Sequence, residues 1–364
     1  MDIVKATRKY EEWLGSHLQI VERDLQLKHE RMAQSRFSFF RATFYRWLQL
    51  WDGVSADLRR APCILSVGDL HVENFGTWRD LEGRLVWGVN DFDEASTFPY
   101  TMDLVRLATS ALLAGQEDQL ALKAQDSAES ILNGYGRGME RGARPFVLEE
   151  ENSWLRGIAL SELRDPVIFW QKMDKLEGVR GAVPKSARKV LEDMLPQPGI
   201  PYRLVHRVAG LGSLGRVRMV ALADWNGGRV AREAKALAPS ALHWADPSSP
   251  RKILYGAILR RAVRCPDPHV QVRGQWVVRR LSPHCSRIEL EELGDNRGEC
   301  RLLEAMGQET ANIHVGTAEK RRAILEDMHK RKASWLINAA QALAEAMDKD
   351  WRSWRERRQD RAPS

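Results

Sequence analysis

Apolar and charged residues recur at helical spacing through the first 58 residues of the chain. The stretch YEEWLGSHLQIVERDLQLKHERMAQ (10–34) shows this spacing, and an aromatic-rich run from Phe37 to Trp51 continues it. Apolar positions that return every three to four residues are typical of helices that bury one face. Pro62 then interrupts the pattern, because proline cannot continue a helix. We therefore predict an N-terminal helical segment over residues 1–60.

Short apolar runs come next. CILSVG (63–68) and LVWGVNDFD (85–93) are too short for ordinary helices, so we predict two buried strands that flank a polar loop. From 101 to 141 the apolar stripe of a helix returns, and we expect more helix up to the loop LPQPGIP (195–201). Residues 61–200 are thus predicted to form a mostly helical catalytic lobe with these two strands.

Strand patterns dominate the third quarter of the chain. Residues 202–236 alternate apolar and polar positions and contain the turn sequences GLGSLG and WNGG, which predicts strands joined by tight turns. A short helix is expected at 250–264, and a hairpin follows over HVQVRGQWVVRRL (269–281), turning at Gly274. Residues 201–285 are therefore predicted to be a small antiparallel β lobe.

Helical spacing returns from 297 to 348, so residues 286–364 are predicted to be C-terminal helices that complete the large lobe. Helices and strands that are separated in this way along the chain indicate an α+β fold. The length of 364 residues allows two or three packed units, and the apolar content of 43% fits a globular protein. No internal repeat is present.

Cysteine usage and charge narrow the cellular setting. The four cysteines stand alone, at 63, 265, 285 and 300, and suggest neither a zinc knuckle nor a disulfide framework. The N-terminus lacks the apolar stretch of a signal peptide, and no apolar run could span a membrane, so we expect a cytoplasmic protein without a membrane partner. The formal charge of +7 permits an anionic partner, but we do not expect nucleic acid, because the basic tail carries much of the excess.

The stretch SVGDLHVENFG (66–76) places unusually dense polar residues directly after a predicted strand. Asp69 and Asn74 are five residues apart, which is the spacing of a kinase catalytic loop. There the Asp orients and deprotonates the acceptor hydroxyl, and the Asn binds magnesium. Asp69 is thus a candidate base and Asn74 a candidate metal ligand.

The second predicted strand ends in GVNDFDEA (88–95), which supplies further acidic residues. In kinases the second metal carboxylate comes from an Asp-Phe-Gly sequence shortly after the catalytic loop. Asp91 and Phe92 have that place, and Asp93 stands where the Gly would be, so Asp91 and Asp93 are candidate magnesium ligands. These acids could instead cap helices or hold turns. A hydrolytic metal site with Asp69, His71, Asp91 and Asp93 as ligands is a further alternative.

A glycine loop and a lysine follow in the β lobe. Gly210, Gly212 and Gly215 form G-x-G-x-x-G, and the strand after the next turn delivers Lys235. Strand, glycine loop, strand, turn and strand with Lys is the arrangement that covers the phosphates in kinases. The glycines let the backbone approach phosphate, and the lysine neutralises it. A glycine-containing hairpin with a surface lysine is the plain alternative.

The predicted kinase parts differ from an ordinary kinase in two ways. Kinases usually hold the lysine with a Glu from the next helix, but residues 249–264 contain no acidic residue. Another carboxylate, such as Glu289, could substitute, or the lysine is held differently, or the site is weakened. The order is also reversed, because the loop with Asp69 and Asp91 precedes the glycine loop by more than a hundred residues. Such an order predicts a circularly permuted fold, which is acceptable when the break falls in exposed connections.

Six motifs in order resemble the bacterial family of uncharacterised proteins called domain of unknown function 2252. They are RMAQSRFSFFRAT (31–43), GDLHVENFG (68–76), NDFDEA (90–95), DLVRLATS (103–110), RVAGLGSLG (207–215) and AKALAPS (234–240). The second to fourth motifs are also similar to aminoglycoside phosphotransferases and other small-molecule kinases. The resemblance implies a protein-kinase-like, two-lobed fold that uses ATP and magnesium, without implying a substrate. Ala42 departs from the family, which tends to have Gly there, and the chain is short for the family.

The sequence thus predicts an ATP- and Mg-dependent phosphotransferase that acts on an unidentified hydroxyl acceptor. Asp103 is expected to brace the catalytic loop, and the helix containing AMGQETANIH (305–314) is expected to pack beneath that loop. His71 is expected to support the loop by hydrogen bonding. A nucleotide-binding pseudoenzyme and a metal-dependent hydrolase stay open as alternatives. The choice between ATP and GTP as the nucleotide also stays open, as does the choice between phosphoryl and adenylyl transfer.

Overall fold

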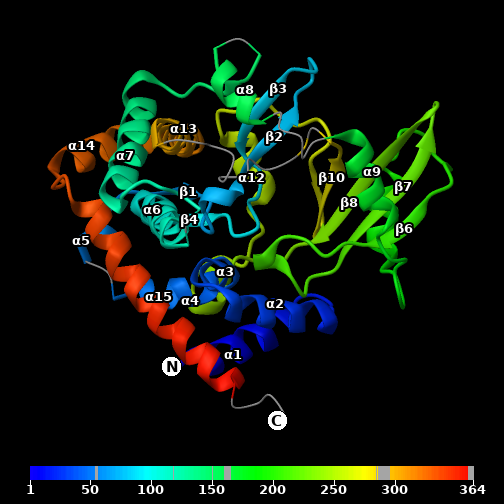
Figure 1. Ribbon diagram of the computed structural model, residues 1–364, viewed down its shortest axis with the longest axis horizontal. Coiled ribbons are helices and arrows are strands. Elements are labelled where there is room, and N and C mark those ends of the chain that lie inside the picture. Colours follow the sequence, from blue (N-terminus) through cyan, green and yellow to red (C-terminus); the bar gives the residue numbers. More distant parts are fainter. Residues whose placement is uncertain are drawn as a thin grey trace.

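Helices and one larger sheet occupy opposite sides of the molecule (Figure 1). The computed structural model describes residues 1–53, 56–117, 119–149, 151–159, 165–283, 285 and 296–359. It contains helices, one five-stranded sheet and two smaller sheets, and every strand pair in them is antiparallel. The predicted α+β class is therefore confirmed.

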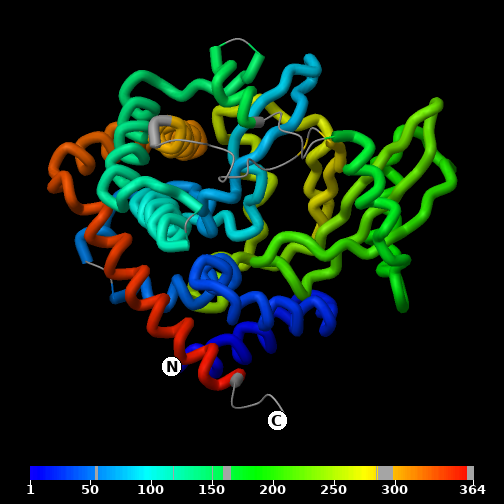
Figure 2. Tube along the Cα trace, viewed as in Figure 1, coloured from blue at the N-terminus to red at the C-terminus, as the bar shows by residue number. Residues whose placement is uncertain are grey.

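The N-terminal residues are helical, as predicted. Their helices are α1 (Ile3–Gly15), α2 (Glu22–Gln34), α3 (Arg36–Ala42), α4 (Phe44–Trp51) and α5 (Ala56–Arg59). Figure 2 shows this trace, in blue, running from the helical side of the molecule towards the sheet. It touches the sheet side directly, because the Val21 amide donates to the Gly215 carbonyl over 2.8 Å. The N-terminal segment therefore bridges the two sides of the molecule.

Short strands position the two polar loops. The strands are β1 (Cys63–Ser66), β2 (Phe75–Arg79), β3 (Leu85–Val89), β4 (Ser96–Pro99) and β5 (Phe146–Val147). The predicted strands at 63–68 and 85–93 correspond to β1 and β3, and β2 and β4 are additional. β1 pairs with β4, whereas β3 lies between β2 and β5. Each polar loop therefore connects a strand of one small sheet to a strand of the other, the first from β1 to β2 and the second from β3 to β4.

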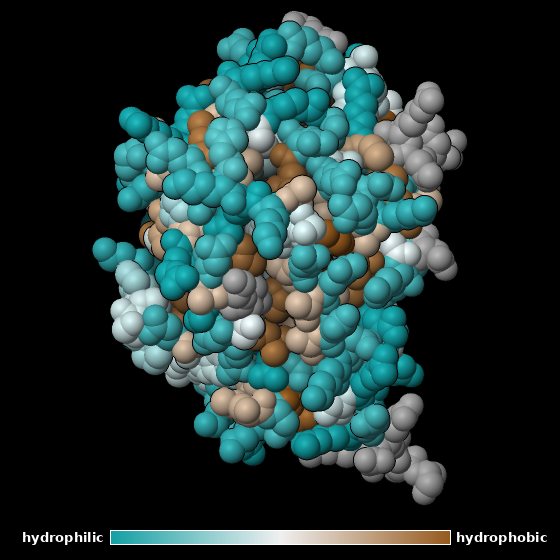
Figure 3. Space-filling model, turned by 90° about the vertical axis from the view of Figure 1, so that its left-hand side faces the viewer, coloured by the Kyte–Doolittle hydropathy of each residue, from teal (hydrophilic) through white to brown (hydrophobic). Residues whose placement is uncertain are grey.

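The helical side closes around these strands. Its other helices are α6 (Tyr100–Gln116), α7 (Ala124–Arg141), α8 (Ser153–Ala159), α13 (Asn296–His314), α14 (Arg321–Lys330) and α15 (Trp335–Gln359). α6 is buried along nearly its whole length, which explains its continuous apolar sequence. Figure 3 views the side of α14 and α15, where hydrophilic residues cover most of the surface and apolar residues show only in narrow bands. By length and hydropathy, no helix in the described part of the chain could span a lipid bilayer.

The five-stranded sheet is formed entirely by strands between residues 203 and 281. Its order is β6 (Arg203–His206), β7 (Arg218–Trp225), β8 (Gly228–Ala236), β10 (Trp276–Leu281) and β9 (Gln271–Arg273). Side chains alternate between its faces. One face packs its apolar residues against α10 (Lys185–Glu192), and part of the other packs against α9 (Pro166–Asp174). The uncovered part of that second face borders the site.

The connection after β8 contains the predicted short helix and one more. Helix α12 (Tyr255–Arg261) lies within the predicted range 250–264, and α11 (Ala241–Ala245) precedes it as an additional helix. Ser240 caps α11, because its hydroxyl accepts from the Leu242 amide. Helix α12 contacts the second polar loop, where the Tyr255 hydroxyl donates to the Asn90 carbonyl over 3.4 Å.

Candidate functional site

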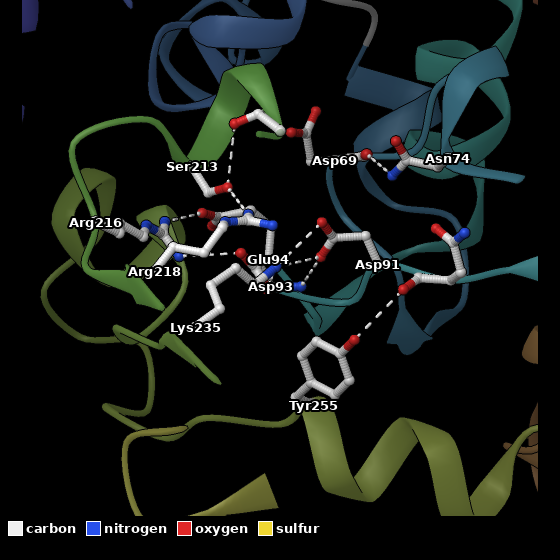
Figure 4. Close-up of polar contacts among 12 residues, drawn as sticks. Asp69, Asn74, Asp91, Asp93, Glu94, Ser213, Arg216, Arg218, Lys235 and Tyr255 are labelled. Carbon is white, nitrogen blue, oxygen red and sulfur yellow. Dashed lines mark hydrogen bonds and ion pairs between the residues drawn. The ribbon is translucent and has the colours of Figure 1, made fainter. Parts of the chain in front are cut away.

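A cleft of about 1080 Å³ lies between the sheet and the helical side. Among its described lining residues, eleven are Lys or Arg and six are Asp or Glu, so the cleft is cationic overall. The predicted site residues that line it are Asp69, Asn74, Asp91, Asp93, Gly210 and Gly212. Lys235 is buried just behind this lining and reaches it through ion pairs. Residues from both polar loops and the glycine loop thus share one cavity (Figure 4).

The first polar loop is fixed from beneath by Asp103. This fully buried carboxylate accepts hydrogen bonds from the amides of Val67 and Gly68, at 2.8 and 2.9 Å. His314, at the end of α13, contacts the same carboxylate over 3.0 Å and Tyr135 over 3.0 Å. The bracing role predicted for Asp103 is confirmed, and the helix containing 305–314 packs beneath the loop as predicted.

Two contacts shape the loop itself. The Asn74 side-chain amide donates to the Asp69 carbonyl over 2.8 Å, which leaves its Oδ1 as the oxygen that a cation would use. His71 Nδ1 accepts from the Glu73 amide over 3.2 Å, so the predicted supporting role of His71 is confirmed. Arg41 pairs with Glu73 over 2.7 Å.

Arg106 holds one oxygen of the Asp69 carboxylate. Its Nε donates to Asp69 Oδ1 over 2.8 Å, and its Nη2 contacts the same oxygen. The guanidinium is fully buried, and the rings of Phe40 and Trp47 lie 4.0 and 4.9 Å from its centre. Burial raises the pKa of the Asp69 carboxyl, and Arg106 opposes this shift. A carboxylate with a raised pKa is better suited to accept a proton near neutral pH.

Lys235 joins the sheet to the second polar loop. Its Nζ lies 2.6 Å from Asp93 Oδ1 and 3.2 Å from Asp91 Oδ2. Burial opposes ionisation of Asp91, but the Lys235 ammonium, together with a hydrogen bond to Asp93 and nearby arginines, holds the pKa of Asp91 below its usual value. Burial and the charge of Asp91 raise the pKa of Asp93. Residues more than 140 positions apart therefore form one buried charge cluster.

Arg216 extends this cluster. It contacts Asp93 over 3.3 Å and Glu94 over 3.1 Å, and its side chain is only 3% exposed. The other Glu94 oxygen accepts from the Ala241 amide over 2.6 Å, at the start of α11. Burial raises the pKa of Glu94 to about 6, against the opposing effect of Arg216. Glu94 thus ties the second polar loop to both the glycine loop and α11.

The glycine loop folds down onto the first polar loop. Gly215 has a φ of +93°, which L side chains rarely adopt. A Cβ at Gly212 would lie 3.1 Å from the Arg41 carbonyl and 3.4 Å from Asp69 Oδ2, so only glycine allows this approach without a shift. Lys28, buried on α2, donates to the Gly212 carbonyl over 3.2 Å. The loop is therefore held from the N-terminal side directly above Asp69.

Glu233 gathers three arginines on the cleft side of the sheet. Its fully buried carboxylate contacts Arg218 over 3.2 Å, Arg279 over 2.8 Å, and also Arg207. Burial opposes ionisation of Glu233, but the three guanidinium groups hold its pKa well below the usual range. The second nitrogen of Arg218 donates to Ser213 Oγ over 2.7 Å, within the glycine loop.

The lysine is held without a helix carboxylate. Its partners in the structure are Asp91 and Asp93, and Glu289 lies outside the described residues. The hydrolase alternative gains no support, because no three His, Cys, Asp or Glu side chains in the described ranges are grouped to hold a metal.

Sequence reasoning missed several site residues. They are Lys28, Arg106, Arg216, Arg218, Glu233 and Arg279. A local signal existed for Glu233, because it lies two positions before Lys235 and so on the same strand face.

Comparison with known proteins supports the family name. Residues 20–198 match the model of the family described as "Uncharacterized protein conserved in bacteria (DUF2252)". The matched part contains both polar loops but ends before the glycine loop and Lys235. No curated protein and no solved structure matches the chain. The resemblance drawn from the motifs is therefore supported over this part of the chain.

Proposed function

We propose that this chain is an ATP- and Mg-dependent phosphotransferase that acts on a hydroxyl acceptor. The observation that carries the proposal is the ion pairing of Lys235 with Asp91 and Asp93, in the cleft that also exposes Asp69 and Asn74. A base, oxygen ligands for a cation and a lysine for phosphate are the parts that phosphoryl transfer needs. We propose with it a protein-kinase-like, two-lobed and circularly permuted fold.

Each residue would have a distinct role. Asp69 would accept the proton of the acceptor hydroxyl, while Arg106 fixes its orientation through Oδ1. Lys235 would neutralise phosphate oxygens, and the backbone around Gly210 and Gly212 would cover them.

The donor set fits magnesium. Asn74 Oδ1 and the Asp91 carboxylate, with Asp93 beside it, are hard oxygen donors at the cleft lining, and magnesium is commonly held by one or two such groups plus phosphates. When bound, the ion would neutralise negative charge on the nucleotide phosphates. Asp91 is the more accessible carboxylate, with 36% of its side chain exposed against 10% for Asp93.

We also propose a cytoplasmic location. The cysteines Cys63, Cys265, Cys285 and Cys300 are all free thiols, which fits a reducing compartment. The cationic cleft fits a nucleotide as the partner.

Nucleotide binding without turnover is the second candidate. The favouring observation is the position of Gly212, whose added Cβ would touch Asp69 Oδ2 at 3.4 Å. A glycine loop this close to the base leaves little room for an acceptor unless the loop lifts. Product formation separates the two candidates, whereas nucleotide binding is common to both.

Titration calorimetry with Mg·ATP tests the nucleotide site. Wild type should bind in a magnesium-dependent manner, and Asp91→Ala and Lys235→Ala should each weaken binding at least about tenfold through a lost charge-assisted contact. Lys189→Met is the matched control, because Lys189 is 75% exposed on α10 and lies outside the cleft lining. No binding of any nucleotide by wild type would refute the proposal.

Labelled ATP tests the reaction. Label at the γ-phosphate that moves to an acceptor supports phosphoryl transfer, whereas label that moves only from the α-phosphate supports adenylyl transfer. Magnesium-dependent binding without transfer of either label to any acceptor tested, with the nucleotide left intact, would favour the non-catalytic candidate.

A further inference from the structure

Three arginines in the cleft have no task in the proposed reaction. Arg207 and Arg218 flank the glycine loop, and Arg279 comes from β10. All three contact Glu233, which is 1% exposed. Arg207 and Arg279 line the cleft, and each keeps 25% of its side chain exposed.

Strand register places this cluster beside Lys235. Arg218 lies opposite Lys235, and Arg279 lies opposite Glu233, on the strands either side of β8. Glu233 and Lys235 are two residues apart on β8, so both side chains point to the same face of the sheet, and the cluster lies next to the lysine. Ser213 links the cluster to the loop above, since its hydroxyl accepts from Arg218 and donates to the Gly210 carbonyl over 3.2 Å (Figure 4).

Guanidinium groups outnumber the carboxylate that they contact in this cluster. Three guanidinium groups share one carboxylate, and each carries five N–H donors. Arg207 uses Nη1 and Arg279 uses Nε towards Glu233. Both side chains line the cleft and keep N–H donors that Glu233 does not use. An arginine fork of this kind matches the oxygens of a phosphate group.

A purely structural role does not explain Arg279. Arg207 and Arg218 close the neck of the glycine loop, where the Arg207 amide donates to the Arg218 carbonyl over 3.3 Å. The Glu233 carboxylate between these two guanidinium groups is sufficient to hold the neck of the loop closed. Arg279 adds a third, partly exposed cation from another strand; Glu233 and the nearby Asp91 favour its charge, but closing the neck of the loop does not require it.

The same face is also unsuited to a purine ring. Base-binding walls are mostly apolar, but the position next to Lys235 holds Glu233 and its arginines. The apolar part of this face, around Val220 and Leu222, is already covered by α9.

We infer that Arg207, Arg218 and Arg279 form an anion subsite that binds a phosphate group of the ligand, next to Lys235 on the same face of the sheet. The phosphate could belong to the nucleotide or to a phosphorylated acceptor. The inference rests on the proposed function for the identity of the nucleotide, but phosphate binding itself can be measured without it.

Calorimetry at fixed ionic strength, without magnesium, tests the subsite with inorganic pyrophosphate and tripolyphosphate. Wild type should bind both, and Arg279→Gln and Arg207→Gln should each weaken binding at least about tenfold. Arg279→Lys keeps the charge and should lose only a few-fold. Arg229→Gln is the matched control, because Arg229 lies on β8 but pairs with Asp174 outside the cleft lining. Wild type that binds neither probe, or glutamine variants that bind within twofold of wild type, would overturn the inference.

Two further arms identify the source of the phosphate. If it belongs to the nucleotide, Arg279→Gln should weaken Mg·ATP at least tenfold and AMP much less. If it belongs to an acceptor, Mg·ATP binding should be unchanged, and the variant should lose binding of glycerol phosphate to the nucleotide-loaded protein. If the Arg279→Gln protein does not fold, probe binding by the Arg207→Gln and Arg279→Lys proteins decides whether the subsite exists.

Failure of the subsite and failure of the proposed function give different results. If Lys235→Ala loses Mg·ATP binding while the Arg279→Gln and Arg207→Gln proteins bind every probe as wild type does, only the subsite proposal is refuted. If the protein binds no Mg·ATP but binds pyrophosphate in a manner that depends on Arg279, the nucleotide proposal is refuted and the subsite proposal is supported.

Discussion

Replacing Asp103 tests whether the first polar loop is held from below. In the folded protein this carboxylate accepts from two backbone amides, of Val67 and Gly68, and contacts His314, with no exposure to water. Asp103→Ala removes all three contacts and leaves buried donors without acceptors. Asp103→Asn keeps the shape but turns one accepting oxygen into a donor, which then faces another donor.

The expected cost follows from these contacts. A buried donor that loses its acceptor costs about 1–3 kcal/mol, so two orphaned amides and the imidazole give roughly 3–9 kcal/mol for Asp103→Ala if the three costs add. Asp103→Asn retains one good acceptor and should cost about 1–3 kcal/mol. Since domains of this kind are stable by only about 5–15 kcal/mol, the alanine variant should be close to unfolding.

Urea unfolding followed by tryptophan fluorescence measures both costs, and nucleotide titration of the folded asparagine variant measures the effect on the site. Asp126→Asn is the control, because Asp126 occupies the first turn of the neighbouring helix α7 but is exposed. A loss below about 1 kcal/mol for Asp103→Ala would show that the amides find other acceptors, and the bracing role would be refuted.

Three other outcomes are expected. Burial raises the pKa of Glu309 to about 7 from 4.5, so the folded state favours the protonated carboxyl, and the free energy of unfolding of wild type should fall by about 3 kcal/mol relative to that of Glu309→Gln between pH 4 and 8. The same pH dependence of urea unfolding in both proteins would contradict this. Arg106→Gln should cost about 3–5 kcal/mol by leaving Asp69 unpaired, and less in an Asp69→Asn background, whereas additive costs in the double-mutant cycle would argue against the pair. Lys28→Met removes the donor to the Gly212 carbonyl, so amide hydrogen exchange across the glycine loop should accelerate several-fold, and unchanged exchange would show that this contact is dispensable.

Local features of the fold could be predicted from the sequence. Helix α6 follows from its apolar stripe, and the strands β1 and β3 follow from short apolar runs. The additional helix α11 could not be predicted in this way, because a tertiary contact holds its first turn. Glu94 binds the first amide of α11 from the other side of the cleft, and no local pattern encodes such a contact.

The candidate site shows the same division. Asp69, Asn74 and Asp91 could be found because their spacing within short loops carries the signal. The partners of Lys235 and Arg216 could not, because they come from a loop more than a hundred residues earlier and meet only when the two sides of the molecule close. The carboxylates that hold Lys235 therefore lie on the second polar loop and not in the helix that follows the lysine.

The two carboxylates beside Lys235 explain why that helix needs no acidic residue. Asp93 lies closest to the ammonium, at 2.6 Å, and is nearly buried, whereas Asp91 is 3.2 Å away and more than a third exposed. Arg216 also contacts Asp93, so this side chain is fixed from two directions. Stability alone is a weak reason for such a buried ion cluster, because apolar residues of similar size are often as stable. Under the proposed function the tasks separate. Asp93 keeps the lysine in place, and Asp91 can turn from it towards a cation at the cleft without leaving the ammonium unpaired.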